Sequence, residues 1–177
     1  DIGGGVRMPI PKITFDIKEA AAPRDVALSL QVLFLLTILT LAPAIIMMMT
    51  AFTRVVIVMD FIKRALSLQQ MPPNQIIIGF SLFLTFFIMA PTFTKINEEA
   101  LQPYLKGKID NEAFFNRGME PLRVFMFKQT REKDIALFIK LAKLPKPKNQ
   151  KDVPTYCLIP AFMISELKRA FEIGVLI

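Results

Sequence analysis

The chain has 177 residues, 53% of them hydrophobic, and a net charge of +7 from 22 Lys and Arg against 15 Asp and Glu. This combination excludes a disordered chain and disfavours a free-standing water-soluble domain. The chain has no His and a single cysteine, Cys157. These counts exclude Ser-His-Asp and Cys-His catalytic arrangements, an internal disulfide and zinc sites of the usual ligand types.

Two long stretches of the chain carry no charged residue. They cover residues 26–53 and 65–94 and follow a mixed N-terminal segment, residues 1–25. A membrane-spanning helix needs about 20 mainly apolar residues, and the first stretch is long enough throughout, whereas the second is near the short end. We therefore predict a membrane-type hydrophobic helical hairpin over residues 26–94. A very hydrophobic soluble helical bundle is the less favoured alternative.

The segment between the two apolar stretches has helical periodicity. We therefore expect the first helix to continue past Arg54, and Pro72-Pro73 to stop it and to begin a new element. The connection is basic, with Lys63 and Arg64, so the positive-inside rule places it in the cytoplasm and both flanks, including residues 1–25, in the periplasm. This placement is in tension with the basic character of residues 95–169.

Residues 95–160 are expected to form a small helical periplasmic domain. We predict that Asp110 caps one helix, that Pro121 kinks this helix or begins the next one, and that Thr130 caps a third. The Pro/Lys-rich residues 144–154 are interpreted as a solvated loop, with a nucleic-acid or anionic-lipid patch as the alternative. No interleaved aromatic residue or DNA-binding motif accompanies these lysines, so no nucleic-acid partner is expected.

Residues 161–177 are expected to begin a third hydrophobic helix, started by Pro160. The sequence becomes fully apolar from Gly174 to Ile177, and it ends there. We therefore expect an all-α fold that is truncated before a second hairpin. Spacings of three and four residues allow two ion pairs within this helix, Glu166 with Arg169 and Lys168 with Glu172.

The chain offers few candidates for ligand chemistry, and no cofactor is expected. Met47, Met48 and Met49 could suggest copper transport, but consecutive helical residues point in different directions and cannot share one ion, so packing within a span is favoured. No Gly-rich phosphate-binding loop or paired acid/base carboxylate is present. Gln31 lies in the first span and needs a partner away from lipid, which indicates contact with another helix.

Five strings resemble, in order, the FliP family of flagellar biosynthesis proteins. The similarity covers LTLAPAIIMMMTAFTRVVIV, LQQMPPNQIIIGFSLFLTFFIMAPTF, EALQPYLKGKID, QTREKDIALF and IPAFMISELKRAFEIG. The injectisome SctR family is similar too, but the strings TRVVIV, PPNQ and LTFFIMAPTF look more like the flagellar branch. An injectisome export-gate subunit and an unrelated oligomeric membrane transporter subunit are the alternatives, and a membrane enzyme is the weakest reading.

The resemblance implies a channel-forming structural subunit of the flagellar type III protein export gate, without enzymatic activity. Family members have a cleaved signal peptide, a helical hairpin, a periplasmic helical domain and a second hairpin. Several copies, typically five, assemble with FliQ and FliR in the bacterial inner membrane, at the flagellar basal body. FlhB, FlhA, the rod-side protein FliE and the exported flagellar proteins are further partners. The family's methionine gasket would lie beyond the end of this chain, so that role is not transferred to Met47, Met48 and Met49.

Six residues are candidate subunit-interface positions. A carboxylate on a mostly apolar helix needs a cation, and a neighbouring subunit could supply one for Glu166. Aromatic residues are enriched in interface cores, although the domain's own core is the alternative for them. The expected consequence is that Glu166→Ala or Phe138→Ala blocks ring assembly more than monomer folding. The full set is Glu166, Phe125, Phe138, Lys168, Arg169 and Gln31.

Overall fold

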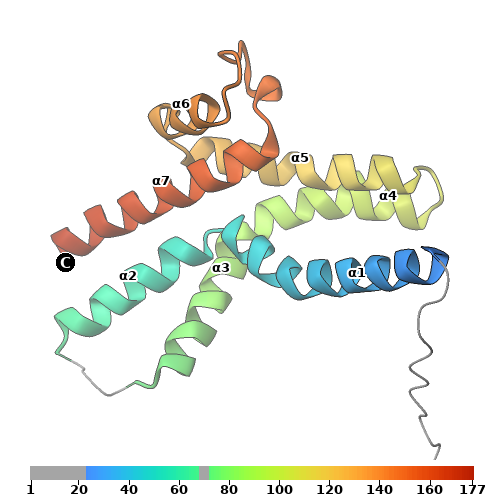
Figure 1. Cartoon of the computed structure of the whole chain (residues 1–177). Helices are drawn as coiled ribbons and strands as arrows, with labels where there is room; N and C mark the ends of the chain where they lie inside the picture. Colours follow the sequence, from blue (N-terminus) through green and yellow to red (C-terminus); the bar gives the residue numbers. More distant parts are fainter. Residues whose placement is uncertain (1–22, 68–71) are drawn as a thin grey trace, which may run out of the picture. The chain divides into compact units, whose positions relative to one another are not determined.

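The computed structural model describes residues 23–67 and 72–177, and all regular secondary structure in these residues is helical (Figure 1). The expectation of an all-α fold is therefore confirmed. The N-terminal segment was predicted over residues 1–25. Residues 1–22 of it lie outside the described residues, and residues 23–25 begin helix α1. The chain divides into two units, residues 1–41 and residues 42–177, which are taken in turn.

The described part of the first unit is the N-terminal portion of α1 (Pro23–Met48). Its apolar side chains are exposed, and Val26–Met48 is long and apolar enough to cross a membrane. The hydroxyls of Thr37 and Thr40 donate to the carbonyls of Leu33 and Leu36, at 2.8 and 2.7 Å. These two hydroxyls are therefore satisfied within the helix and can face an apolar surrounding.

The expectation that the first helix continues past Arg54 is wrong. Helix α1 ends at Met48, and α2 (Phe52–Ala65) begins after a buried turn at residues 49–51. The hydroxyl of Thr50 donates to the Met47 carbonyl at 2.8 Å and accepts the Phe52 amide at 3.3 Å. A threonine can offer the backbone such local bonds in place of helical ones, and periodicity does not report them.

A long helical run follows the connection at Pro72-Pro73. It consists of α3 (Asn74–Ile96), a π-helical segment η1 (Asn97–Leu101) and α4 (Gln102–Leu105), and it is also long and apolar enough to span a membrane. The start directly after Pro73 agrees with the sequence prediction. Helix α3 packs on α2 and on α5 (Asn111–Gln129), and its buried face includes Ser81, Thr85 and Met89.

A tight turn reverses the chain between α4 and α5. Gly107 adopts φ +65°, a conformation that glycine accepts without steric cost. The carboxylate of Asp110 then accepts the Ala113 amide at 2.8 Å, which confirms the predicted N-cap of α5. Pro121 lies inside α5, which continues to Gln129. Pro121 was expected either to kink its helix or to begin the next one, and the second alternative is excluded.

Two further helices complete the second unit. Helix α6 (Glu132–Leu141) is joined to α7 (Thr155–Leu176) by a loop that contains the short 3-10 helix η2 (Gln150–Asp152). The prediction that Pro160 starts α7 is wrong, since the Pro154 carbonyl accepts the amides of Cys157 and Leu158 and the helix begins at Thr155. Both of these side chains are buried and hold this first turn in the core.

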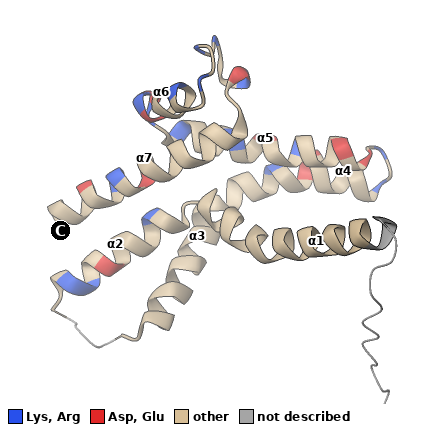
Figure 2. Cartoon of the chain, in the orientation of Figure 1, with Lys and Arg blue, Asp and Glu red and all other residues tan. Residues whose placement is uncertain are grey.

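The hydrophobic core of the second unit lies where α5, α6 and α7 meet. Met126, Ile139, Leu158 and Phe162 are buried there, together with Met49 from the turn before α2. Helix α7 also runs along α2, so it links the helix after the first apolar stretch to the helices of the C-terminal half (Figure 1). Figure 2 shows that charged residues concentrate on α2 and on α4–α7, whereas α3 is almost uncharged.

Candidate functional site: a buried polar network between three helices

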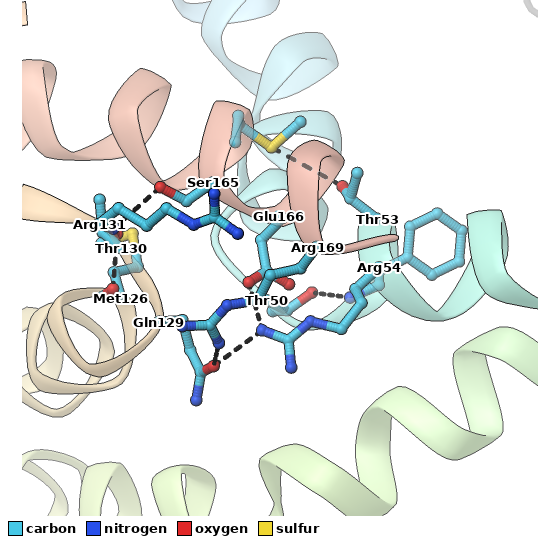
Figure 3. Close-up of polar contacts among 12 residues, drawn as sticks. Thr50, Thr53, Arg54, Met126, Gln129, Thr130, Arg131, Ser165, Glu166 and Arg169 are labelled. Carbon is cyan, nitrogen blue, oxygen red and sulfur yellow. Dashed lines mark hydrogen bonds and ion pairs between the residues drawn. The ribbon is translucent and has the colours of Figure 1, made fainter. Parts of the chain in front are cut away.

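A buried ion pair joins α2 to α7. The side chain of Glu166 on α7 is fully buried, and its Oε1 contacts the Nη2 of Arg54 on α2 (Figure 3). The Arg54 side chain is 25% exposed. Removing a carboxylate from water costs several kcal/mol unless a cation and hydrogen bonds compensate. Arg54 therefore provides within the same chain the cationic partner that Glu166 requires.

The network also includes α5 through Gln129. The Oε1 of Gln129 accepts hydrogen bonds from Arg54 Nη2 at 2.8 Å and from Arg169 Nη1 at 2.5 Å. The pair of Glu166 with Arg169, which the spacing allows, does not form, since Glu166 pairs with Arg54. Arg169 reaches the next helix rather than back along its own, because α5 lies against this side of α7 (Figure 3).

The network is incompletely satisfied. Glu166 Oε2 and Arg54 Nε are buried and have no hydrogen-bond partner among the residues that the structure describes. Two guanidinium groups share one carboxylate and one amide, so the cluster carries a net positive charge. Buried polar atoms without a partner cost about 1–3 kcal/mol each, which makes this a site where a further donor or acceptor would be stabilising.

A second polar network fixes the start of α6 on α7. Ser165 accepts the Arg131 backbone amide at 3.0 Å and donates to Asp134 Oδ2 at 2.7 Å, and Lys168 Nζ donates to Asp134 Oδ1. Arg131 forms an ion pair with Glu172 at 2.7 Å. The pair of Lys168 with Glu172, which the spacing allows, does not form, because Asp134 on α6 and Arg131 at its start pair with Lys168 and Glu172 instead.

The second network perturbs two ionisation equilibria. Burial alone would raise the pKa of Asp134, but the hydrogen bonds from Lys168 and Ser165, with the nearby positive charges, outweigh it and hold the pKa below its usual value. The hydrogen bond and charge of Glu172 raise the pKa of Arg131. Asp134 also lies in the first turn of α6, where a negative charge interacts favourably with the helix dipole.

The predicted cap residue Thr130 does not begin α6. Its hydroxyl donates to the Met126 carbonyl at 2.7 Å, so it completes the end of α5 instead. Arg131 occupies the N-cap position of α6, and its side chain makes no capping hydrogen bond. Ser165 of α7 accepts the Arg131 backbone amide, so a residue distant in sequence holds the chain at the start of α6.

The six predicted interface residues occupy different environments. Phe125 and Phe138 are half-buried and pack on the chain's own core, where the Phe125 and Phe162 rings meet edge to face with centroids 5.8 Å apart. Gln31 is exposed on α1, and the Lys168 side chain is 48% exposed. Glu166 and Arg169 share the Gln129 network, whereas Lys168 belongs to the second network. Whether any of the six contacts another subunit stays a prediction.

Sequence reasoning missed Arg54 and Gln129 as members of the site. Arg54 is the first charged residue after the uncharged residues 26–53, and that position was its available signal. Gln129 gave no signal, because its role depends on two helices that are distant in sequence. Among the described residues, no group of three or more potential metal ligands comes together. The thiol of Cys157 is buried, which raises its pKa.

Comparison with known proteins gives a consistent picture. Residues 35–177 match the model of the FliP family. The protein named flagellar biosynthetic protein FliP is 49% identical in Bacillus subtilis, over 92% of this chain and 73% of that protein. The protein of the same name in Treponema pallidum is 51% identical over 94% of this chain and 62% of that protein. The one in Borreliella burgdorferi is 49% identical over 94% of this chain and 66% of that protein. The chain thus spans about two thirds of the length of these relatives.

Proposed function

The chain belongs to the FliP family of flagellar biosynthetic proteins, and from this premise we propose that it is a channel-forming structural subunit of the flagellar type III export gate. In this proposal several copies, five in the family pattern, assemble with FliQ and FliR in the bacterial inner membrane at the flagellar basal body. FlhB, FlhA and FliE are neighbours, and flagellar proteins pass through the assembled gate. In this proposal the chain forms part of the channel wall and catalyses no reaction.

The observation that carries the proposal is the apolar surface that the second unit leaves uncovered. On α3, large aromatic side chains are exposed, including Phe83 at 65%, Phe86 at 63% and Phe87 at 77%. Contiguous apolar surface of this kind marks a membrane or a protein interface. The opposite side of α3, with Ile77, Ser81, Thr85 and Met89, is buried within the chain. Helix α3 therefore has one face for its own chain and another for lipid or neighbouring subunits.

The buried networks support an assembly role. Helix α7 is joined to α2 through Arg54 and Glu166, and to α6 through Asp134, Ser165 and Lys168. We propose that residues 95–160 form a periplasmic domain and that these bonds fix this domain relative to α2. A rigid connection fixes the angle between the helices of each subunit, so that copies packed side by side around the channel repeat the same curvature. In the same proposal Gln31 and Lys168, which are exposed, contact neighbouring subunits.

The unpaired oxygen of Glu166 supports a role at the interface for this residue too. Its Oε1 is paired within the chain, but Oε2 has no partner among the described residues. A donor from a second copy or from a companion protein could complete the carboxylate. Within this proposal, Glu166 holds α2 against α7, and its buried Oε2 receives a donor from outside the chain only where assembly opens the packing around it.

A deletion experiment in the source bacterium tests the function. Removal of the gene that encodes this chain should abolish flagellar filaments and the release of flagellar proteins into the medium, and a plasmid copy should restore both. Growth rate and membrane potential serve as controls for general damage. A deletion strain with normal filaments would contradict the proposal. If that strain instead lost secretion of another set of proteins through a type III system, the chain would be an injectisome subunit.

A further inference from the structure

A groove on the second unit is separate from the apolar spans and from the Arg54–Glu166 network. It has a volume of about 800 Å³ and lies between α5, α6 and the loop that follows α6. The floor of the groove is apolar and consists of buried or half-buried side chains. The lysines that line the groove are exposed. The floor residues are Phe127, Ile135, Ile139, Leu144 and Val153.

The rim of the groove is basic on two sides. Helix α6 contributes Lys133 and Lys140, and the loop contributes Lys146 and Lys148, against a single acidic lining residue, Glu132. Within the described part of the chain, none of these four lysines takes part in an ion pair. The groove thus combines an apolar floor with a rim of net positive charge, whose lysines form no ion pair with a described carboxylate.

The loop that carries two of these lysines is held in place. Arg123 on α5 donates to the Gln150 and Val153 carbonyls at 3.1 and 2.8 Å, and its guanidinium lies over the Phe127 ring at 5.4 Å. Asn149 and Asp152 form a capping box that closes the 3-10 turn. The sequence suggested a solvated loop, and its lysines are exposed, but its backbone is fixed. A preformed groove binds a ligand with a smaller loss of conformational entropy.

We propose that this groove binds an acidic segment of a partner protein. Apolar side chains of that segment would enter the floor, and its Asp and Glu side chains would pair with the lysines on both sides. A second hollow, of about 490 Å³, adjoins the first and shares Phe127, Asn149 and Gln150 with it, so the surface is elongated. Its lining adds two basic residues, Arg123 and Lys151, and one acidic residue, Glu120.

The geometry favours a polypeptide over two other anionic ligands. An anionic lipid places its charge at one end and its chains at the other, whereas here the lysines stand on both sides of the apolar floor. Single-stranded nucleic acid needs exposed aromatic rings for base stacking. The one aromatic ring in the groove, Phe127, is half-buried and already covered by Arg123. An extended or helical acidic segment satisfies both the floor and the rim.

Site-specific photo-crosslinking in cells tests this inference. The full chain would carry p-benzoylphenylalanine in place of Lys146, and mass spectrometry would identify the adduct after irradiation. We expect an adduct with a segment of another protein that has a net negative charge and apolar residues. An adduct with lipid, with nucleic acid, with a second copy of the chain or with a segment that is not acidic would overturn the proposal. So would an adduct yield no higher than that from the probe at Lys106, on the turn after α4.

Two sets of variants separate the charge of the rim from the floor. Lys133→Glu combined with Lys140→Glu should reduce the adduct yield roughly tenfold, since two exposed charge pairs are lost and charge reversal adds repulsion. Ala136→Trp, at an exposed groove position, should reduce it by filling the floor while leaving all charges in place. The matched control, Lys106→Glu with Lys108→Glu, should not change it.

An unchanged yield in both groove variants would also overturn the proposal. The amount of each variant in the membrane, measured by immunoblot, shows that a lower yield is not caused by loss of the protein. Failure of the groove proposal is distinguishable from failure of the export-gate proposal. Gene deletion tests the function of the whole chain, whereas the groove variants test one surface.

Discussion

At the scale of single residues, Glu166 is a fully buried carboxylate that depends on a cation, and the packing of α2 on α7 supplies it. Spacing along α7 suggested Arg169, which lies on the same helix. The structure pairs Glu166 with Arg54, which is 112 positions away in the sequence, and gives Arg169 to Gln129. The spacing rule describes an isolated helix, whereas a fully buried carboxylate is paired by whatever helix packs on it. The need for a cation was predictable from the apolar setting, but its source was not.

The buried ion pair gives the first prediction. Glu166→Ala should lower the free energy of unfolding of the purified chain in detergent by about 3–5 kcal/mol, because it leaves Arg54 partly buried without a counter-charge. The double variant Arg54→Met, Glu166→Leu should recover most of this loss. Chemical denaturation followed by circular dichroism would measure both.

The matched control for this experiment is the exposed pair of Asp60 and Arg64 on α2. Their side chains are 48% and 75% exposed, so Asp60→Ala should change stability by no more than about 0.5 kcal/mol. Equal effects of Glu166→Ala and Asp60→Ala would contradict the importance assigned to the buried pair.

The lowered pKa of Asp134 predicts how the stability of the fold depends on pH. Its pKa is lowered in the folded chain, so the carboxylate stabilises the fold above its unfolded-state pKa of about 3.9, and this contribution is lost as the pH falls through the folded value. Asp134→Asn should therefore be less stable than the wild type at pH 7, and the difference should shrink below about pH 4. Thermal unfolding of both proteins across this range would show it. A difference that is constant with pH would mean that ionisation of Asp134 contributes nothing.

At the scale of elements, the sequence predicted the existence of the helices better than their ends. The apolar runs, the Asp110 cap and the helix start after Pro73 were all readable, because each depends on nearby residues. The break at residues 49–51 and the early start of α7 were not. Both ends are fixed by buried turns that pack in the core, where tertiary contacts override the local pattern.

The packing of α2 on α7 depends on a close approach at Gly174. A Cβ atom added there would lie 2.5 Å from Cδ2 of Phe61 on α2, whose ring also contacts Phe171 with centroids 5.7 Å apart. Gly174→Ala should therefore displace Phe61 and destabilise the chain by about 1–3 kcal/mol, measured by thermal unfolding in detergent.

The matched control for this substitution is Gly79→Ala on α3. A Cβ atom at Gly79 meets nothing within 4 Å, so this change should stabilise the helix by up to about 1 kcal/mol. If both alanine variants had the same effect, the close contact between α2 and α7 would not be a determinant of stability.

At the scale of the whole molecule, composition and charge placement together indicated the class of protein. The hydrophobic fraction alone showed only that a soluble domain was disfavoured. The two uncharged stretches located the candidate spans, and the family match over residues 35–177 identified the chain as a membrane-associated flagellar protein. The buried networks and the basic groove required three-dimensional contacts between distant helices, which no single stretch of sequence contains.

The mass of the detergent-purified complex tests the central claim most directly. The full chain, tagged and co-expressed with FliQ and FliR, would be purified from membranes and measured by native mass spectrometry. We predict one large assembly that contains several copies of this chain together with both companions. A monomer or dimer that contains neither FliQ nor FliR, at normal expression of all three proteins, would contradict the export-gate account.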